Sequence, residues 1–106
     1  MRRGTTPTFV FQLDTPTLDL TTLTQIWVTI EDGRDEQKTW DISNVTVDNE
    51  NKTISLYLTQ EETLAFATGT ARVQIRMLTS NGAAIATDYS TIEIHNVLKK
   101  GVITNE

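Results

Sequence analysis

Few side chains in this sequence could carry out catalysis. The chain has one histidine, His95, and no cysteine. A nucleophile needs a base within hydrogen-bond reach, and a single histidine near the end of an expected strand offers no convincing pair. The chain also lacks a serine in a Gly-x-Ser-x-Gly turn and a glycine-rich phosphate loop. We therefore expect no enzymatic activity and no catalytic residues.

Acidic residues form two clusters that could suggest a functional site. Asp32-Gly33 centres a charged loop between two expected strands, whose carboxylates could suggest calcium, and Glu61 and Glu62 are adjacent carboxylates that could suggest catalysis. The loop lacks the ligand spacing of a helix–loop–helix calcium site, and Asp-Gly is ordinary turn chemistry. Thr59 and Glu62 have the spacing of a capping box, which accounts for the second cluster. We expect no metal, no other cofactor and no small-molecule substrate.

Length and charge limit the domain count and the partners. The 106 residues carry a net charge of −5, with a pI of about 4.7. A nucleic-acid duplex or an anionic membrane surface would need clustered Lys and Arg, so we expect neither. No apolar run approaches the roughly 18 residues of a spanning helix, and no secretory signal is visible. We expect one domain over residues 1–106, with a flexible N-terminal arm at 1–7 and a C-terminal tail at 99–106.

Period-two alternation of apolar and polar residues predicts short β-strands along most of the chain. The central stretch, Thr53–Ala86, reads as strand, one short helical turn near Thr59–Phe66, strand, tight turn and strand. The other expected strands occupy Thr8–Leu13, Gln25–Glu31, Lys38–Ile42, Val45–Val47 and Ala84–Ile94.

Turn signals separate these strands. Asn81-Gly82 predicts a hairpin with a type I′ turn, which needs positive φ at both residues. A shift of pattern at Ala86–Asp88 predicts a β-bulge in the last strand. Pro16 and the run Asp19–Thr22 predict a loop with one helical turn.

About seven short strands with regular turn signals predict an all-β fold, an immunoglobulin-like antiparallel β-sandwich. Trp40, on the third expected strand, occupies a position at which immunoglobulin-like folds often bury a tryptophan. A small open barrel or a jelly roll is the alternative.

Five residues are candidates for binding a partner: Arg2, Arg3, Val10, Trp27 and Tyr57. The two arginines are the densest positive charge in an acidic chain, and they form either a disordered tail or an arm that docks on an acidic neighbour. If the first, second and fifth strands are neighbours, Val10, Trp27 and Tyr57 share one outer sheet face. Exposed aromatic residues are enriched at interfaces. The alternative is that a terminal segment, such as Val97-Leu98, covers them.

Three parts of the sequence carry a resemblance to a known family. They are the opening Met-Arg-Arg-Gly-Thr-Thr-Pro-Thr of Met1–Thr8, the pair Leu58–Leu64 and Val73–Arg76 before Asn81-Gly82, and the closing Val97–Ile103. Together they resemble small proteins of tailed phages and prophages of Gram-positive gut bacteria, encoded near tail and baseplate genes, over nearly the whole chain. About half of the chain is also similar to the immunoglobulin-like N-terminal domain of phage baseplate upper proteins.

The resemblance implies a virion structural protein that is assembled in the host cytoplasm and acts through protein–protein contacts. Its partners would be other virion proteins and further copies of itself in a tail or baseplate. The long C-terminal extension of baseplate upper proteins is absent, so a small adaptor or plug fits the length better than a receptor holder. The alternatives are a capsid decoration protein, docked by its N-terminal arm, and a module that binds a host-surface glycan or protein. A glycan site would need an exposed aromatic beside paired carboxylates or amides, for which Trp27 is the candidate.

Overall fold

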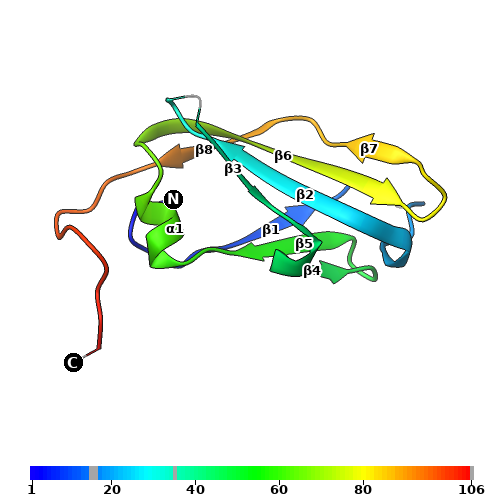
Figure 1. The fold of residues 1–106 in the computed structure, drawn as a ribbon, viewed down its shortest axis with the longest axis horizontal. Helices are drawn as coiled ribbons and strands as arrows, with labels where there is room; N and C mark the ends of the chain where they lie inside the picture. The colour runs from blue at the N-terminus through cyan, green and yellow to red at the C-terminus, as the bar shows by residue number, and fades with distance from the viewer. Residues whose placement is uncertain (15–16, 35, 106) are drawn as a thin grey trace.

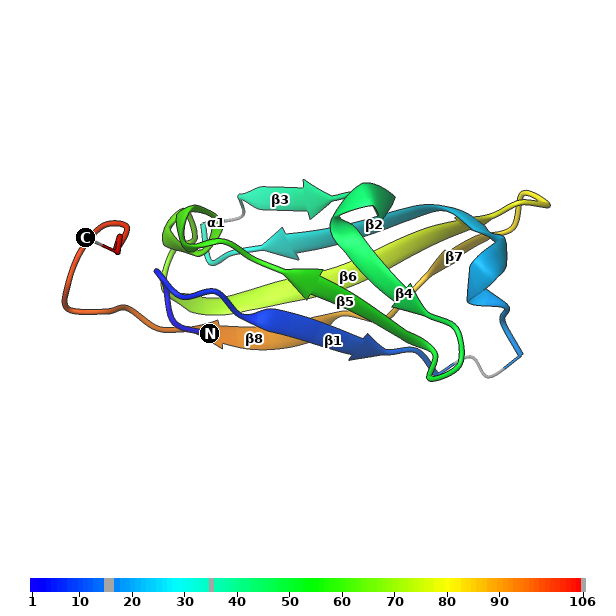
Figure 2. The same ribbon diagram turned by 90° about the horizontal axis from the view of Figure 1, so that it is seen from below.

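The computed structural model describes residues 1–14, 17–34 and 36–105. Two antiparallel β-sheets pack face to face, and within the described residues one short α-helix closes an end of the sandwich (Figure 1 and Figure 2). The three-stranded sheet has the order β1 (Thr8–Gln12), β5 (Thr53–Tyr57) and β4 (Val45–Asp48). The five-stranded sheet consists of β3 (Gln37–Trp40), β2 (Leu23–Glu31), β6 (Gly69–Thr79), and then β7 (Ala84–Ala86) and β8 (Ser90–Ile94), which both pair with β6.

The predicted alternation explains how the two sheets form one core. On β6, Ala71, Val73, Ile75 and Met77 are buried, whereas the residues between them point outward. Ile54 and Leu56 of β5 face them from the other sheet and are fully buried. At about 25 cal/mol per Å² of apolar surface, this cluster is the main stabilising term of the fold. The sandwich prediction is therefore confirmed.

The strand order matches an immunoglobulin sandwich that lacks its first strand. In the usual lettering, β1, β5 and β4 correspond to strands B, E and D, while β3, β2, β6 and the β7–β8 pair correspond to C′, C, F and G. Trp40 is buried as expected, but it lies on β3 in the C′ position and not on strand C. Strand C is β2, where the buried residue opposite Trp40 is Val28.

The predicted helical turn is the α-helix α1 (Gln60–Leu64), which connects β5 to β6 across the end of the sandwich. Thr59 and Glu62 form the expected capping box: each side chain accepts a hydrogen bond from the backbone N–H of the other. Glu62 also accepts a hydrogen bond from the Trp40 indole, and the Trp40 ring lies 6.3 Å from that of Phe66. Phe66 is 1% exposed, so this end of the core is closed.

The β6–β7 hairpin differs from the predicted type I′ turn. Gly82 has φ +88°, but no positive φ occurs at Asn81. Gly82 N–H donates to the Thr79 carbonyl at 3.0 Å, and Thr79 N–H donates to the Ala83 carbonyl at 2.9 Å. This is a three-residue loop, in which an ordinary turn is followed by a left-handed glycine. The sequence signal located the hairpin, but the loop is one residue longer than expected.

The expected last strand, Ala84–Ile94, is divided into β7 and β8. Arg76 pairs with Ala86 and Val73 pairs with Ser90, so three residues of the link stand opposite two of β6. The predicted bulge is therefore present as a complete break in the strand.

Two one-turn 3-10 helices, η1 (Leu20–Thr22) and η2 (Ile42–Asn44), precede β2 and β4. Pro16, in the loop predicted before β2, lies outside the described residues. Glu106, at the end of the predicted C-terminal tail, also lies outside them.

Candidate interaction surfaces

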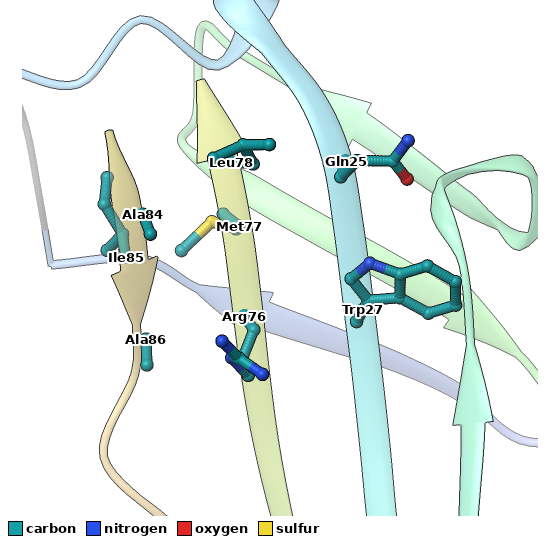
Figure 3. Close-up of a pocket in the computed structure, with 8 residues that line it drawn as sticks. All are labelled: Gln25, Trp27, Arg76, Met77, Leu78, Ala84, Ile85 and Ala86. Atoms are coloured by element: carbon teal, nitrogen blue, oxygen red, sulfur yellow. The ribbon is translucent and has the colours of Figure 1, made fainter. Parts of the chain in front are cut away.

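A hollow of the described surface lies on the outer face of the five-stranded sheet, around Trp27 (Figure 3). Side chains of β2 and β6 alternate here, so Trp27 stands directly across from Arg76, and Gln25 across from Leu78. Ala84 and Ala86 of β7 border the hollow, whose volume is about 350 Å³, and their small side chains leave it open. Trp27 is 43% exposed, so its indole is available to a partner. We call these six residues the Trp27 surface.

Arg76 has no hydrogen-bond or ion-pair partner among the described residues of this surface. Its neighbour Arg72, also on β6, is engaged: the Arg72 guanidinium pairs with Glu31 and lies 5.2 Å from the centre of the Tyr89 ring. Hydrogen bonds from Arg72 and Gln37 lower the pKa of Glu31. The Trp27 surface thus presents an aromatic ring beside an unneutralised positive charge, in a chain of net charge −5.

The prediction that Val10, Trp27 and Tyr57 share one outer face is wrong. β1 pairs with β5, which brings Val10 and Tyr57 together on the three-stranded sheet. Trp27 is on β2, whose neighbours are β3 and β6, so it lies on the other sheet and faces the opposite side of the molecule. Val10 is 61% and Tyr57 56% exposed, so both form a second outward patch. The error came from treating β2 as a neighbour of β1, whereas a sandwich connection carries the chain across to the other sheet.

The N-terminal residues are hydrogen-bonded into the fold, although the sequence suggested a flexible arm over 1–7. Arg2 forms a parallel bridge with His95, just beyond β8, and the Met1 ammonium donates to the Glu93 carbonyl at 2.6 Å. Arg2 and Arg3 also donate to Asn96, so neither guanidinium extends toward solvent as a free arm.

Arg3 and Gly4 attach this segment to α1. The Arg3 guanidinium donates to the Leu64 carbonyl at 2.6 Å, and the Gly4 N–H donates to the Thr63 hydroxyl at 2.9 Å. Gly4 has φ +77°, and an added Cβ there would lie 3.4 Å from Leu64 and 3.7 Å from Val97. Val97 is therefore packed near Gly4 and does not cover Val10, Trp27 or Tyr57. Leu98 is fully exposed.

The acidic loop after β2 contains a buried carboxylate. Burial would raise the pKa of Asp32, but the Ala67 and Arg34 amides and the Arg34 guanidinium donate hydrogen bonds to it, and together they lower its pKa to about 2. Asp32 thereby connects the β2–β3 loop to the chain that leaves α1. Sequence reasoning identified this residue only as part of a turn, because the Ala67 contact is 35 positions away.

Among the residues that the structure describes, no group of three or more His, Cys, Asp or Glu could hold a metal ion. In the same part of the chain, no helix has the length and apolarity needed to cross a membrane. Comparison with protein-family models, curated proteins and solved structures found no match. The fold and its surfaces thus define a class, an immunoglobulin-like β-sandwich with exposed aromatic residues on both outer faces.

Proposed function

We propose that this chain is a non-enzymatic structural protein of a phage virion, located in the tail or baseplate and acting through contacts with other virion proteins and with copies of itself. The sequence resemblance supplies the phage setting. Under this proposal the protein is assembled in the host cytoplasm and remains in the virion.

The observation that carries the proposal is the Trp27 surface. Tryptophan and arginine are, with tyrosine, the residues most enriched at binding hot spots, which are surrounded by contacts that contribute little energy but exclude water. Trp27 and Arg76 are adjacent on two rigid strands, and the small Ala84 and Ala86 leave room beside them for a partner's side chain. A rigid site of this kind loses little conformational entropy on binding.

The test is incorporation into virions. A Trp27→Ser variant of the gene is placed in a phage or prophage that carries it, and the protein's copy number in purified particles is measured by mass spectrometry. We expect at least a roughly tenfold loss, because an aromatic hot spot contributes on the order of 2 kcal/mol or more. Tyr57→Ser, which removes an exposed aromatic ring from the other sheet, shows by comparison whether the second outward patch also contributes. The proposal fails if the wild-type protein is absent from particles, or if the two variants are incorporated like the wild type.

A host-surface glycan module is a second candidate, favoured by one observation. A sugar site combines an exposed aromatic ring with amide or carboxylate groups, and Gln25 lies two residues before Trp27 on the same face. A glycan array probed with the purified domain separates the two candidates. Binding that is lost in both Trp27→Ser and Gln25→Ala would favour the glycan module, whereas no binding is expected of a tail component.

A capsid decoration protein is less well supported. That role would use the Arg2-Arg3 arm to dock on the head lattice. Here Arg2 and Arg3 donate to Asn96 and Leu64 of their own chain, and these bonds would have to break first.

A further inference from the structure

The outer edge of β1 carries backbone groups that no described strand satisfies. β1 pairs only with β5. The Leu58 N–H donates to the Pro7 carbonyl at 3.0 Å and the Leu13 N–H donates to the Lys52 carbonyl at 2.9 Å, which fixes the odd-numbered residues as those bonded to β5. In an antiparallel ladder alternate residues bond to opposite sides. The N–H and C=O groups of Thr8, Val10 and Gln12 therefore point away from β5, toward an open edge.

Among the edge strands of the described fold, β1 is the one without protection. Native proteins protect edges with charges, with very short strands or with a covering segment. β3 contains Lys38, β4 ends at Asp48, and β7 has three residues. β8 contains Glu93, and the Arg2–His95 bridge lies at its end. The five residues of β1, Thr-Phe-Val-Phe-Gln, carry no charge and no proline.

Apolar side chains on β1 also remain partly exposed. Val10 is 61% exposed on the outer face. Phe9 and Phe11 face the core, with ring centres 6.2 Å apart, but neither is completely buried. Beside them a hollow of about 230 Å³ opens between β1 and the β7–β8 link. In a complete immunoglobulin sandwich an additional strand would lie along this edge.

We propose that a second copy of this chain occupies the edge, by pairing its own β1 antiparallel to the first around a two-fold axis at Val10. The inference rests on the proposed self-association in the virion and names the surface that mediates it. The two three-stranded sheets become one continuous sheet. Val10 stands opposite Val10 of the second copy, Thr8 opposite its Gln12, and Phe9 opposite its Phe11.

Two features make the pairing self-complementary. The open residues are all even-numbered, and a register centred on Val10 places even-numbered residues opposite each other, so the open hydrogen-bonding groups meet. Charge is the second feature. Each copy carries −5, so two copies repel wherever carboxylates would meet. The uncharged β1 is the edge along which they can approach without placing like charges opposite each other.

The size of the contact sets the expected affinity. Five strand residues per copy make a small interface, at the low end of specific complexes, below about 1,200 Å² in total. We therefore expect an association that depends on concentration in solution and is strengthened where the virion holds copies close together.

The first test uses the absence of cysteine from the chain. In Val10→Cys the two sulfur-bearing residues face each other across the axis, at the roughly 5.5 Å Cα spacing of a hydrogen-bonded pair, which suits a disulfide. Thr46→Cys places a cysteine at another exposed position, on β4, the other edge of the same sheet. We expect Val10→Cys to form disulfide-linked dimers at least about tenfold faster than Thr46→Cys under mild oxidation, because pairing raises the local thiol concentration. Equal rates would overturn the proposal.

The second test is solution mass by light scattering over a concentration series. Val10→Lys places two like charges opposite each other and should raise the concentration for half-dissociation at least about tenfold. Thr46→Lys adds the same charge on β4 and should leave that concentration unchanged. A wild-type chain that stays monomeric throughout the series would overturn the inference. The inference would also be overturned if Val10→Lys left self-association unchanged but abolished binding to another virion protein. In that case a strand of the other protein, and not a second copy of β1, would occupy the edge.

These outcomes are independent of the virion proposal. Val10 and Trp27 lie on different sheets, so Val10→Lys leaves the Trp27 surface intact. If Val10→Lys is monomeric and Trp27→Ser still fails to enter particles, the two surfaces have separate roles. If dimers form as expected but the wild type is absent from particles, the virion proposal fails and the β1 pairing remains.

Discussion

The two tryptophans show how the same side chain serves opposite purposes in this sandwich. Trp40, on β3, is 7% exposed, packs beside Phe66 and donates its indole N–H to Glu62. Trp27, on β2, is 43% exposed and lies beside Arg76, which has no partner among the described residues. At the α1 end Glu62 accepts the hydrogen bond of the Trp40 indole, whereas at the Trp27 surface the Arg76 guanidinium has no partner among the described residues. The first region should therefore determine the free energy of unfolding, and the second should determine binding.

The largest expected effect is at Trp40. Trp40→Ala removes a buried ring and leaves a cavity, which costs about 3–5 kcal/mol. In a domain of this size each kcal/mol lowers Tm by roughly 4–8 °C. We expect Tm to fall by at least about 12 °C, or the variant not to fold. Thermal unfolding followed by circular dichroism measures this, and Trp40→Phe, which retains most of the ring volume, should recover a large part of the loss. A Tm within a few degrees of the wild type would show that Trp40 is not part of the core.

Asp32 gives an intermediate effect with a defined pH dependence. Its pKa is lowered from 3.8 to about 2 in the folded protein, so its contribution to stability is present above pH 4 and is lost as the pH falls toward 2. Since Arg34 is half exposed, solvent screening reduces the value, and we expect Asp32→Asn to cost about 1–2 kcal/mol at pH 7.

Urea unfolding at several pH values between 2 and 7 tests this prediction. The difference between the wild type and Asp32→Asn should shrink as the pH falls through that window. Asp88→Asn, at an exposed aspartate with no hydrogen-bond partner among the described residues, is the control and should change the free energy of unfolding by no more than about 0.5 kcal/mol. A difference that is constant with pH would mean that the charge of Asp32 does not stabilise the loop.

Much of this contrast could be predicted from sequence, because it depends on local signals. The alternation along β5 and β6, the Thr59–Glu62 capping box and the burial of Trp40 depend on residues that are close in the chain or share one periodic pattern. The sandwich itself was predicted for the same reason. These signals concern which face of an element is apolar, and the hydrophobic effect determines that face.

The candidate surfaces were less predictable, because they depend on which strands are neighbours. Val10 and Tyr57 were correctly placed on one face, but Trp27 was assigned to the wrong sheet. The position of Arg76 across from Trp27 requires the β2–β6 register, which no local signal gives. Similarly, nothing near Arg2 indicates that it bridges to His95, 93 residues away, and pairing over that distance is decided by the whole fold.

The smallest expected effect on stability is at Trp27. This small effect would separate Trp27, as a binding residue, from Trp40, as a stabilising one. Trp27 is partly exposed, so Trp27→Ala loses only part of the ring's apolar burial and should lower the free energy of unfolding by about 1 kcal/mol, well below the cost at Trp40. Its fluorescence should be quenched by acrylamide in the free protein, whereas that of Trp40 should not, and the single variants Trp27→Phe and Trp40→Phe separate the two signals. Adding the binding partner should then protect Trp27 from the quencher, because a hot-spot aromatic is desolvated when it binds.

If Trp27→Ala melts the fold as severely as Trp40→Ala, the division between a stabilising end and a binding face is wrong. A Trp27 that stays fully quenched in assembled particles would instead locate the contact elsewhere, and the Val10–Tyr57 patch on the opposite sheet would be the next surface to test.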